Sequence, residues 1–265
     1  MGYEEFIRLY AFIMAGLVGL CVGSFLNVVI YRVPNGMNLA RPSSHCTTCD
    51  YVLRWYDNIP VLSYIILGGR CRKCGQRISP RYMIVEIVNA LLWLLSAHLF
   101  LDENPVYAVI CAIVLSALIC IFFIDLEHLL IFNRFVIIVL VAGIVAIFFD
   151  RYTEWYDHLI GTAAFGGAFL LIYYGAIWIL KREGLGFGDV KLAFAAGLLL
   201  GWQRMLFAML IASVSASIIL VILRRVRGDE EGHEYPFGPF LAVGIGAAML
   251  FGAPVISWYT SLLGF

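Results

Sequence analysis

Long apolar stretches separated by short polar segments dominate the chain. Seven stretches carry at most one charged residue each, and they cover residues 9–31, 83–101, 104–124, 135–149, 158–180, 205–223 and 235–265. A helix of about 20 apolar residues spans the hydrocarbon core of a bilayer. The pattern therefore predicts an all-α polytopic membrane protein with one larger polar segment at 32–82. The first stretch is too long for the apolar part of a cleavable signal, and we expect it to be a transmembrane helix.

The distribution of Lys and Arg predicts the orientation of these helices. Residues 32–82 hold eight Lys and Arg against two Asp, and basic loops stay in the cytoplasm. The segment 32–82 is therefore predicted to be cytoplasmic and the N-terminus to lie outside. One uncharged segment, 192–203, gives only about 18 Å of helix. If it crosses, the basic run at 224–227 is also cytoplasmic, so charge favours about eight transmembrane helices.

The polar segment divides the chain into three predicted regions. Residues 1–31 form the first transmembrane helix, 32–82 a cytoplasmic domain with four cysteines, and 83–265 the remaining membrane domain. The chain is 62% hydrophobic and has a formal net charge of zero. This balance predicts contact with the lipid bilayer and no nucleic-acid partner. The oligomeric state does not follow from the sequence.

Four of the seven cysteines form two close pairs in the polar segment. Cys46 and Cys49 in HCTTC, and Cys71 and Cys74 in RCRKC, give the spacing C-x2-C-x21-C-x2-C. In a reducing compartment such a pattern is typical of tetrahedral structural zinc rather than of disulfides. A redox-active dithiol pair and a chance arrangement are the alternatives. With four cysteine ligands, no position is left for a catalytic water.

Two aspartates stand at the predicted cytoplasmic boundary of the membrane. Asp125 ends the apolar stretch 104–124, and Asp189 follows three glycines in GLGFGDVK. Each could simply be a polar residue at a helix end, but ionisable residues at membrane depth are usually functional. Two neighbouring carboxyl groups share a proton, so one can act as a base and the other as an acid. Helix dipoles favour Asp189 as the ionised base. Glu86, early in the stretch 83–101, is either a substrate contact or a residue that reaches to water.

Several motifs together resemble bacterial type IV prepilin peptidases. They are GSFLNVVIYRVP, WYDNIPVLSY in the cysteine-bearing loop, ISPRYMIVE, FIDLEH, EGLGFGDVKL and YPFGPFLAVG. The resemblance covers nearly the whole chain. It implies a GxGD-type aspartyl protease of the bacterial inner membrane that cuts the basic leader from type 4 prepilins and from pseudopilins of type II secretion, on the cytoplasmic side.

The resemblance also assigns residues and a second activity. The catalytic pair corresponds to Asp125 and Asp189, and the zinc ligands to Cys46, Cys49, Cys71 and Cys74. Relatives with the large cysteine-bearing loop also N-methylate the new terminus, using S-adenosylmethionine. The sequence does not identify the residues that bind this methyl donor, and it contains no GxGxxG-type fingerprint. Nor does it identify the natural substrates.

The chain departs from the family pattern at two positions. Phe132 and Thr47 stand where the family usually has proline, which affects loop geometry and removes no catalytic group.

Two other functions stay open at this point. A transporter or channel could use the aspartates as a proton relay, and it would show ion flux. A membrane thiol oxidoreductase would cycle the cysteine pairs and lack zinc.

Overall fold

The computed structural model describes residues 2–181, 184–227 and 235–262. Secondary structure in these ranges is helical, apart from two isolated β-bridges in the polar segment. The longer helices are α1 (Tyr3–Arg32), α3 (Arg81–Phe100), α4 (Pro105–His128), α5 (Asn133–Phe149), α7 (Gly167–Leu180), α8 (Phe187–Arg227) and α9 (Gly238–Leu262). The shorter elements are η1 (Trp55–Asp57), α2 (Leu62–Ile66), α6 (Trp155–Gly161) and a π-helical turn, η2 (Thr162–Gly166).

The prediction of an all-helical membrane protein is confirmed. Within the described ranges, six helical segments are long and apolar enough to cross a membrane. The apolar helix α5, with 17 residues, is shorter. Helix α8 contains a non-helical residue, Gly201, so its 41 residues form two arms. Counting α5 and both arms gives eight helical segments, the number that the charge pattern favours; which of them cross the bilayer, and in which direction, stays a prediction.

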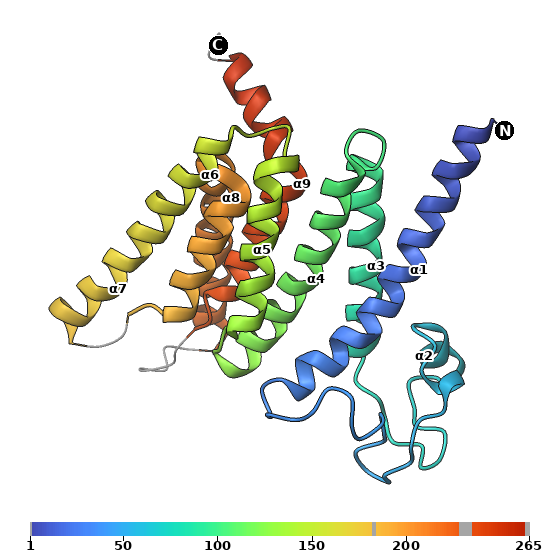
Figure 1. Ribbon diagram of the computed structural model, residues 1–265. Helices are drawn as coiled ribbons and strands as arrows, with labels where there is room; N and C mark the ends of the chain where they lie inside the picture. The colour runs from blue at the N-terminus through green and yellow to red at the C-terminus, as the bar shows by residue number, and fades with distance from the viewer. Residues whose placement is uncertain (1, 182–183, 228–234, 263–265) are drawn as a thin grey trace. The chain divides into compact units, whose positions relative to one another are not determined.

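The chain divides into two compact units, residues 1–120 and 121–265. In the first unit, α1 packs along α3 (Figure 1). The two helices approach so closely at Gly23 that a Cβ there would lie only 2.8 Å from the Glu86 Cα. Glycine at this position avoids that clash. The buried Asn89 amide then donates to the Gly19 carbonyl oxygen and accepts from the Ser116 hydroxyl. One polar side chain thus connects α1, α3 and α4 inside this unit.

In the second unit, the two arms of α8 run in opposite directions. Gly201 has φ +74°, a conformation that glycine adopts without strain. Along the arm after it, Arg204 lies near Gly252 and Ala208 near Gly244, so this arm is antiparallel to α9. The arm before Gly201 and α9 both begin beside Ile131, so this first arm runs in the same direction as α9 and opposite to the second arm. Its residues Phe187–Leu200 span about 21 Å, less than the hydrocarbon thickness of about 30 Å.

A buried polar cluster holds the turn at Gly201. Arg204, only 3% exposed, forms an ion pair with Asp150 and donates to the Thr153 hydroxyl. The Trp202 indole N–H donates to Asp157 over 2.9 Å. This pairing compensates the charge of Arg204 inside the protein.

Candidate functional site

Both aspartates predicted from the sequence lie in the second unit and are buried. Asp125 is 5% exposed in the last turn of α4, and Asp189 is 7% exposed in the first turn of α8. The two carboxyl groups are close enough to interact electrostatically. Ile131, in the segment between α4 and α5, lies beside Gly188 at the beginning of α8 and beside Gly238 at the beginning of α9. The fold therefore brings together two carboxyl groups that are 64 positions apart in the sequence.

The N-terminal ends of two helices, α8 and α9, lie at this carboxyl pair. The Gly238 backbone N–H, at the beginning of α9, donates to the Asp125 carboxylate. Asp189 itself stands in the first turn of α8. The N-termini of α8 and α9 favour negative charge at Asp189 and Asp125, whereas the C-terminus of α4 disfavours it at Asp125. The beginning of α9 therefore offsets part of the dipole difference predicted from the sequence, which did not show that α9 begins at Asp125.

Asp189 keeps an acceptor atom free of partners inside the protein. Its Oδ1 is buried and has no hydrogen-bond partner within the described ranges, whereas Gly186 forms a backbone hydrogen bond with this carboxyl group. Buried oxygens without a partner are rare in folded proteins and mark sites where a water or substrate binds. The pair therefore combines shared burial, mutual interaction and an unused acceptor, which is the arrangement that acid–base hydrolysis needs.

Two glycines beside the aspartates leave no room for a side chain. A Cβ at Gly238 would lie 2.5 Å from Asp125 Oδ2, and a Cβ at Gly188 would lie 2.8 Å from the Ile131 Cβ. Gly188, in the glycine-rich segment before Asp189, therefore has a structural reason to be glycine, since a side chain there would push Ile131 away from the pair.

The four cysteines of the polar segment gather in the first unit. Each Cys-x2-Cys turn closes with the same hydrogen bonds: the Cys46 N–H donates to the Tyr51 carbonyl, and the Cys71 N–H to the Gln76 carbonyl. The residue after each pair has a positive φ, 53° at Asp50 and 72° at Gly75. An isolated bridge flanks each turn. Two equivalent knuckles thus present their thiols to one point.

The sulfur geometry fits a tetrahedral metal. All four Sγ atoms lie within 4.8 Å of one another, with Cys46–Cys74 at 3.8 Å and Cys49–Cys71 at 3.9 Å. Zinc–sulfur bonds of about 2.3 Å place the sulfurs of a tetrahedron about 3.8 Å apart. Backbone N–H groups of Thr48 and Cys49 lower the pKa of Cys46 to about 6. Although the Tyr51 N–H favours the Cys49 thiolate, burial and the neighbouring sulfurs raise the pKa of Cys49 to about 12. A divalent cation would relieve this crowding of thiolates.

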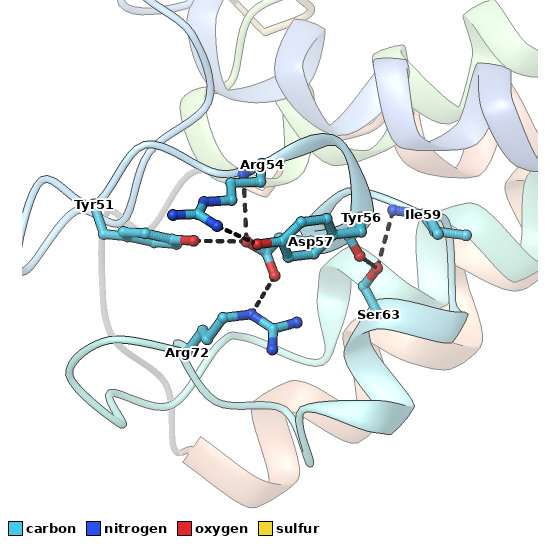
Figure 2. Close-up of polar contacts among 7 residues, drawn as sticks. All are labelled: Tyr51, Arg54, Tyr56, Asp57, Ile59, Ser63 and Arg72. Carbon is cyan, nitrogen blue, oxygen red and sulfur yellow. Dashed lines mark hydrogen bonds and ion pairs between the residues drawn. The ribbon is translucent and has the colours of Figure 1, made fainter.

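A polar network around Asp57 holds the two halves of the cysteine-bearing segment together (Figure 2). The Asp57 carboxylate accepts from Arg72 at 2.6 Å, from the Tyr51 hydroxyl at 3.0 Å and from the Arg54 N–H at 3.3 Å. Burial raises the pKa of the Asp57 carboxyl, but these hydrogen bonds outweigh burial and leave the pKa below its ordinary value. The sequence alone indicates no more than a turn residue at Asp57, because its partner Arg72 lies 15 positions away.

Replacing Asp57 should loosen this network without touching the cysteines. Asp57→Asn keeps the shape but loses the charge that pairs with Arg72, whose side chain is 43% exposed. We expect a local destabilisation of about 1–2 kcal/mol, less than for a fully buried pair. Hydrogen exchange of residues 51–72 in the intact protein should become about tenfold faster. The exposed Asp50→Asn, in the same segment, is the control; equal exchange in the two variants would contradict the structural role of Asp57.

Comparisons with known proteins identify the family of this chain. A family model described as bacterial peptidase A24 N-terminal domain matches residues 17–100, and one described as type IV leader peptidase family matches residues 112–221. A Pseudomonas putida protein named prepilin leader peptidase/N-methyltransferase is 33% identical, over 97% of this chain and 96% of its own length. The chain belongs to the type IV leader peptidase family. This confirms the resemblance stated from the sequence motifs.

Other relatives in the type IV leader peptidase family carry the same name. One from Pseudomonas aeruginosa is 33% identical over 94% of this chain and 93% of its own length. One from Myxococcus xanthus is 38% identical over 80% of this chain and 63% of its own length. No solved structure is significantly similar to the chain. The two family models match on either side of residues 101–111, so the cysteine cluster and the aspartates fall in different matched regions.

Proposed function

We propose that this member of the type IV leader peptidase family cleaves the leader from type 4 prepilins or type II secretion pseudopilins, with Asp125 and Asp189 as the catalytic pair. It then N-methylates the new amino terminus, with S-adenosylmethionine as methyl donor. The observation that carries the proposal is the pair of buried, interacting carboxyl groups, one of them with a free acceptor oxygen. The names of the relatives support both activities.

The aspartate pair supplies the acid and the base for peptide hydrolysis. The ionised carboxyl group takes a proton from a water molecule, whose oxygen attacks the scissile carbonyl carbon. The protonated carboxyl group transfers its proton to the carbonyl oxygen, which gives a tetrahedral gem-diol. The carboxyl group that took the proton from water then passes it to the leaving amine, while the other carboxylate takes back a proton from a gem-diol hydroxyl as the C=O bond reforms and the C–N bond breaks. The N-terminal ends of α8 and α9 stabilise the charge that the pair holds in common.

The location of the pair agrees with the chemistry of a prepilin. Asp125 lies at the end of an apolar helix and Asp189 at the beginning of another. In the proposed orientation, with the N-terminus outside, both face the cytoplasmic boundary of the bacterial inner membrane. A substrate with a basic leader and an apolar helix would place its scissile bond at that boundary, because the leader stays in water and the helix in lipid.

One experiment tests both activities. Purified protein is incubated with a prepilin and methyl-labelled S-adenosylmethionine, and mass spectrometry follows the product. Loss of the leader together with gain of one methyl group is the expected result. An intact prepilin after incubation with folded protein would reject the peptidase, and a cleaved but unmethylated product would reject the second activity.

The four cysteines are proposed to hold one structural zinc ion. Cys46, Cys49, Cys71 and Cys74 would supply four thiolates, and zinc would fix a segment with few buried apolar residues. The metal would then order the loop and take no part in cleavage or methyl transfer.

Removing one cysteine tests this structural role. We expect Cys71→Ser to lose the metal and to make the segment 32–82 more than tenfold more sensitive to proteolysis, because a three-ligand site binds zinc poorly. Metal analysis and limited proteolysis of protein purified without chelators measure both effects. Cys21→Ser, in α1 and outside the cluster, is the matched control. Unchanged metal content in Cys71→Ser would contradict the assignment.

A further inference from the structure

A cavity of about 470 Å³ lies wholly within the first unit. Its wall is formed by the last turns of α1, the first turns of α3 and the cysteine-bearing segment. Four tyrosines line it, together with aliphatic side chains: Tyr31, Tyr51, Tyr64 and Tyr82. A cavity of this size with a mostly apolar surface is typical of a small-molecule or chain-terminus site, and its lining also includes the charged residues Arg32, Asp57, Arg72, Arg77 and Glu86.

A carboxylate without a cationic partner faces this cavity. Glu86, in the second turn of α3, lines the cavity and is 8% exposed. Its Oε2 accepts from the Val61 N–H at 2.7 Å, and the Ser24 hydroxyl also forms a hydrogen bond with it. No ion pair joins Glu86 to any residue in the described part of the chain. Three arginines line the cavity: Arg72 is paired with Asp57, Arg32 donates to backbone carbonyl oxygens of residues 38, 39 and 42, and Arg77 belongs to the cysteine-bearing segment. A buried carboxylate that has hydrogen bonds but no counter-ion is suited to a cationic ligand.

A second acceptor in the cavity wall lacks a donor. Asn27, on α1, is 4% exposed, and its Oδ1 has no hydrogen-bond partner within the described ranges. The orientation of its amide is fixed, because Nδ2 donates to the Tyr82 carbonyl at 3.0 Å. Asn27 and Glu86 lie on the two helices that pack together at Gly23. A ligand with several N–H donors would satisfy Oδ1 and the carboxylate at once.

The backbone next to Glu86 is held in an uncommon conformation. Val61, which also lines the cavity, has φ +61° and ψ −49°. A β-branched residue rarely adopts a positive φ, and such strain persists where surrounding contacts enforce it, often at binding sites. In this conformation the Val61 N–H donates to Glu86, so the uncommon backbone and the carboxylate lie together in the cavity wall.

We propose that Glu86 and Asn27 bind the free amino terminus of the cleaved substrate, which makes this cavity the methyl-acceptor site. The inference rests on the proposed methyltransferase activity and adds the residues that perform it. An ammonium group carries one positive charge and three N–H donors, which match one carboxylate and one amide oxygen. Both residues lie near the ends of apolar helices, the depth at which the N-terminus of an apolar substrate helix would stand in the membrane.

Glu86 also has a role in the transfer itself. Its carboxylate takes one proton from the ammonium group, which leaves a neutral amine with a lone pair. The amine nitrogen attacks the methyl carbon of the sulfonium donor, the carbon–sulfur bond breaks and its electron pair stays on sulfur. The product is a secondary ammonium group, and the proton on Glu86 passes to water.

Glu86→Gln in the full-length protein tests this assignment. The probe is a peptide with a free amino-terminal phenylalanine and an apolar sequence, with methyl-labelled S-adenosylmethionine as donor. We expect the methylation rate to fall about 100-fold, as for loss of a general base. Raising the pH should restore part of the rate, because the amine then loses its proton in solution. Affinity for S-adenosylmethionine and leader cleavage should stay within about twofold of wild type. Glu4→Gln, exposed and in α1, is the control.

Each outcome separates this inference from the proposed function. A wild-type protein that does not methylate the probe would overturn the methyltransferase activity itself. Wild-type methylation by Glu86→Gln would overturn only the role of Glu86. A loss of donor affinity in this variant would assign the carboxylate to the donor's own ammonium group and overturn the acceptor site. If Glu86→Gln also loses cleavage, and so its fold, Asn27→Ala decides: we expect a KM for the peptide about tenfold higher with donor affinity retained, and an unchanged KM would overturn the site.

Discussion

Asp125→Asn and Asp189→Asn should each reduce prepilin cleavage about 10³-fold or more while the protein stays folded. An amide can neither take a proton from water nor hold the proton that the pair shares, and members of an acid–base pair act as a unit. Both residues are buried in the same unit, so each loss should be nearly complete. The rate of leader loss, followed by mass spectrometry in a single-turnover assay, measures the effect. Thermal unfolding of each variant should match that of wild type.

The same variants should still methylate a substrate that has already been cleaved. The aspartates belong to the second unit, whereas the cavity with Glu86 belongs to the first. Methyl transfer needs a free amine and therefore follows cleavage on an intact prepilin. Asp189→Asn should transfer methyl groups to pre-cleaved pilin at close to the wild-type rate. A folded Asp189→Asn without this activity would place both reactions at one site, and wild-type cleavage in either variant would remove the catalytic pair.

Local sequence features were enough to predict the helices and the cysteine cluster. Charge-free stretches predict helices because each buried backbone group must be paired within its own segment. Cys46 and Cys49 predict their own turn, since two thiols three positions apart converge only when the chain folds back between them. The pairing with Cys71 and Cys74 followed from the repeat of the same spacing. Neither conclusion required knowledge of how the helices pack.

Features that depend on helix packing were not predicted. The hydrogen bond from Gly238 to Asp125 joins residues 113 positions apart, and YPFGPF gave no sign of it. Glu86 looked equally consistent with a residue that reaches to water, because its isolation from cations appears only when Ser24 and Val61 are seen beside it. The reversal of direction in α8 is an exception, because the uncharged segment 192–203 and the basic run at 224–227 predicted two separate helices there. Only its exact position, Gly201, could not be predicted, since a single glycine within an apolar run does not mark a turn by itself.

Gly238→Ala should impair cleavage almost as severely as loss of an aspartate, although it removes no functional group. A methyl group at this position would lie 2.5 Å from Asp125 Oδ2 and 2.9 Å from the carboxyl carbon, distances that Cβ atoms do not tolerate. Either the carboxyl group rotates away from Asp189 or the beginning of α9 moves, and both changes weaken the hydrogen bond from the Gly238 N–H. A displacement of about 1 Å at a catalytic group costs on the order of 10²-fold in rate. Single-turnover cleavage should show this loss in the rate of the chemical step, with methylation of pre-cleaved pilin unchanged.

Gly175→Ala in α7 is the matched control, because nothing lies within 4 Å of the added methyl group and alanine favours the helix. Equal cleavage rates in the two variants would mean that Asp125 does not need the position in which α9 holds it.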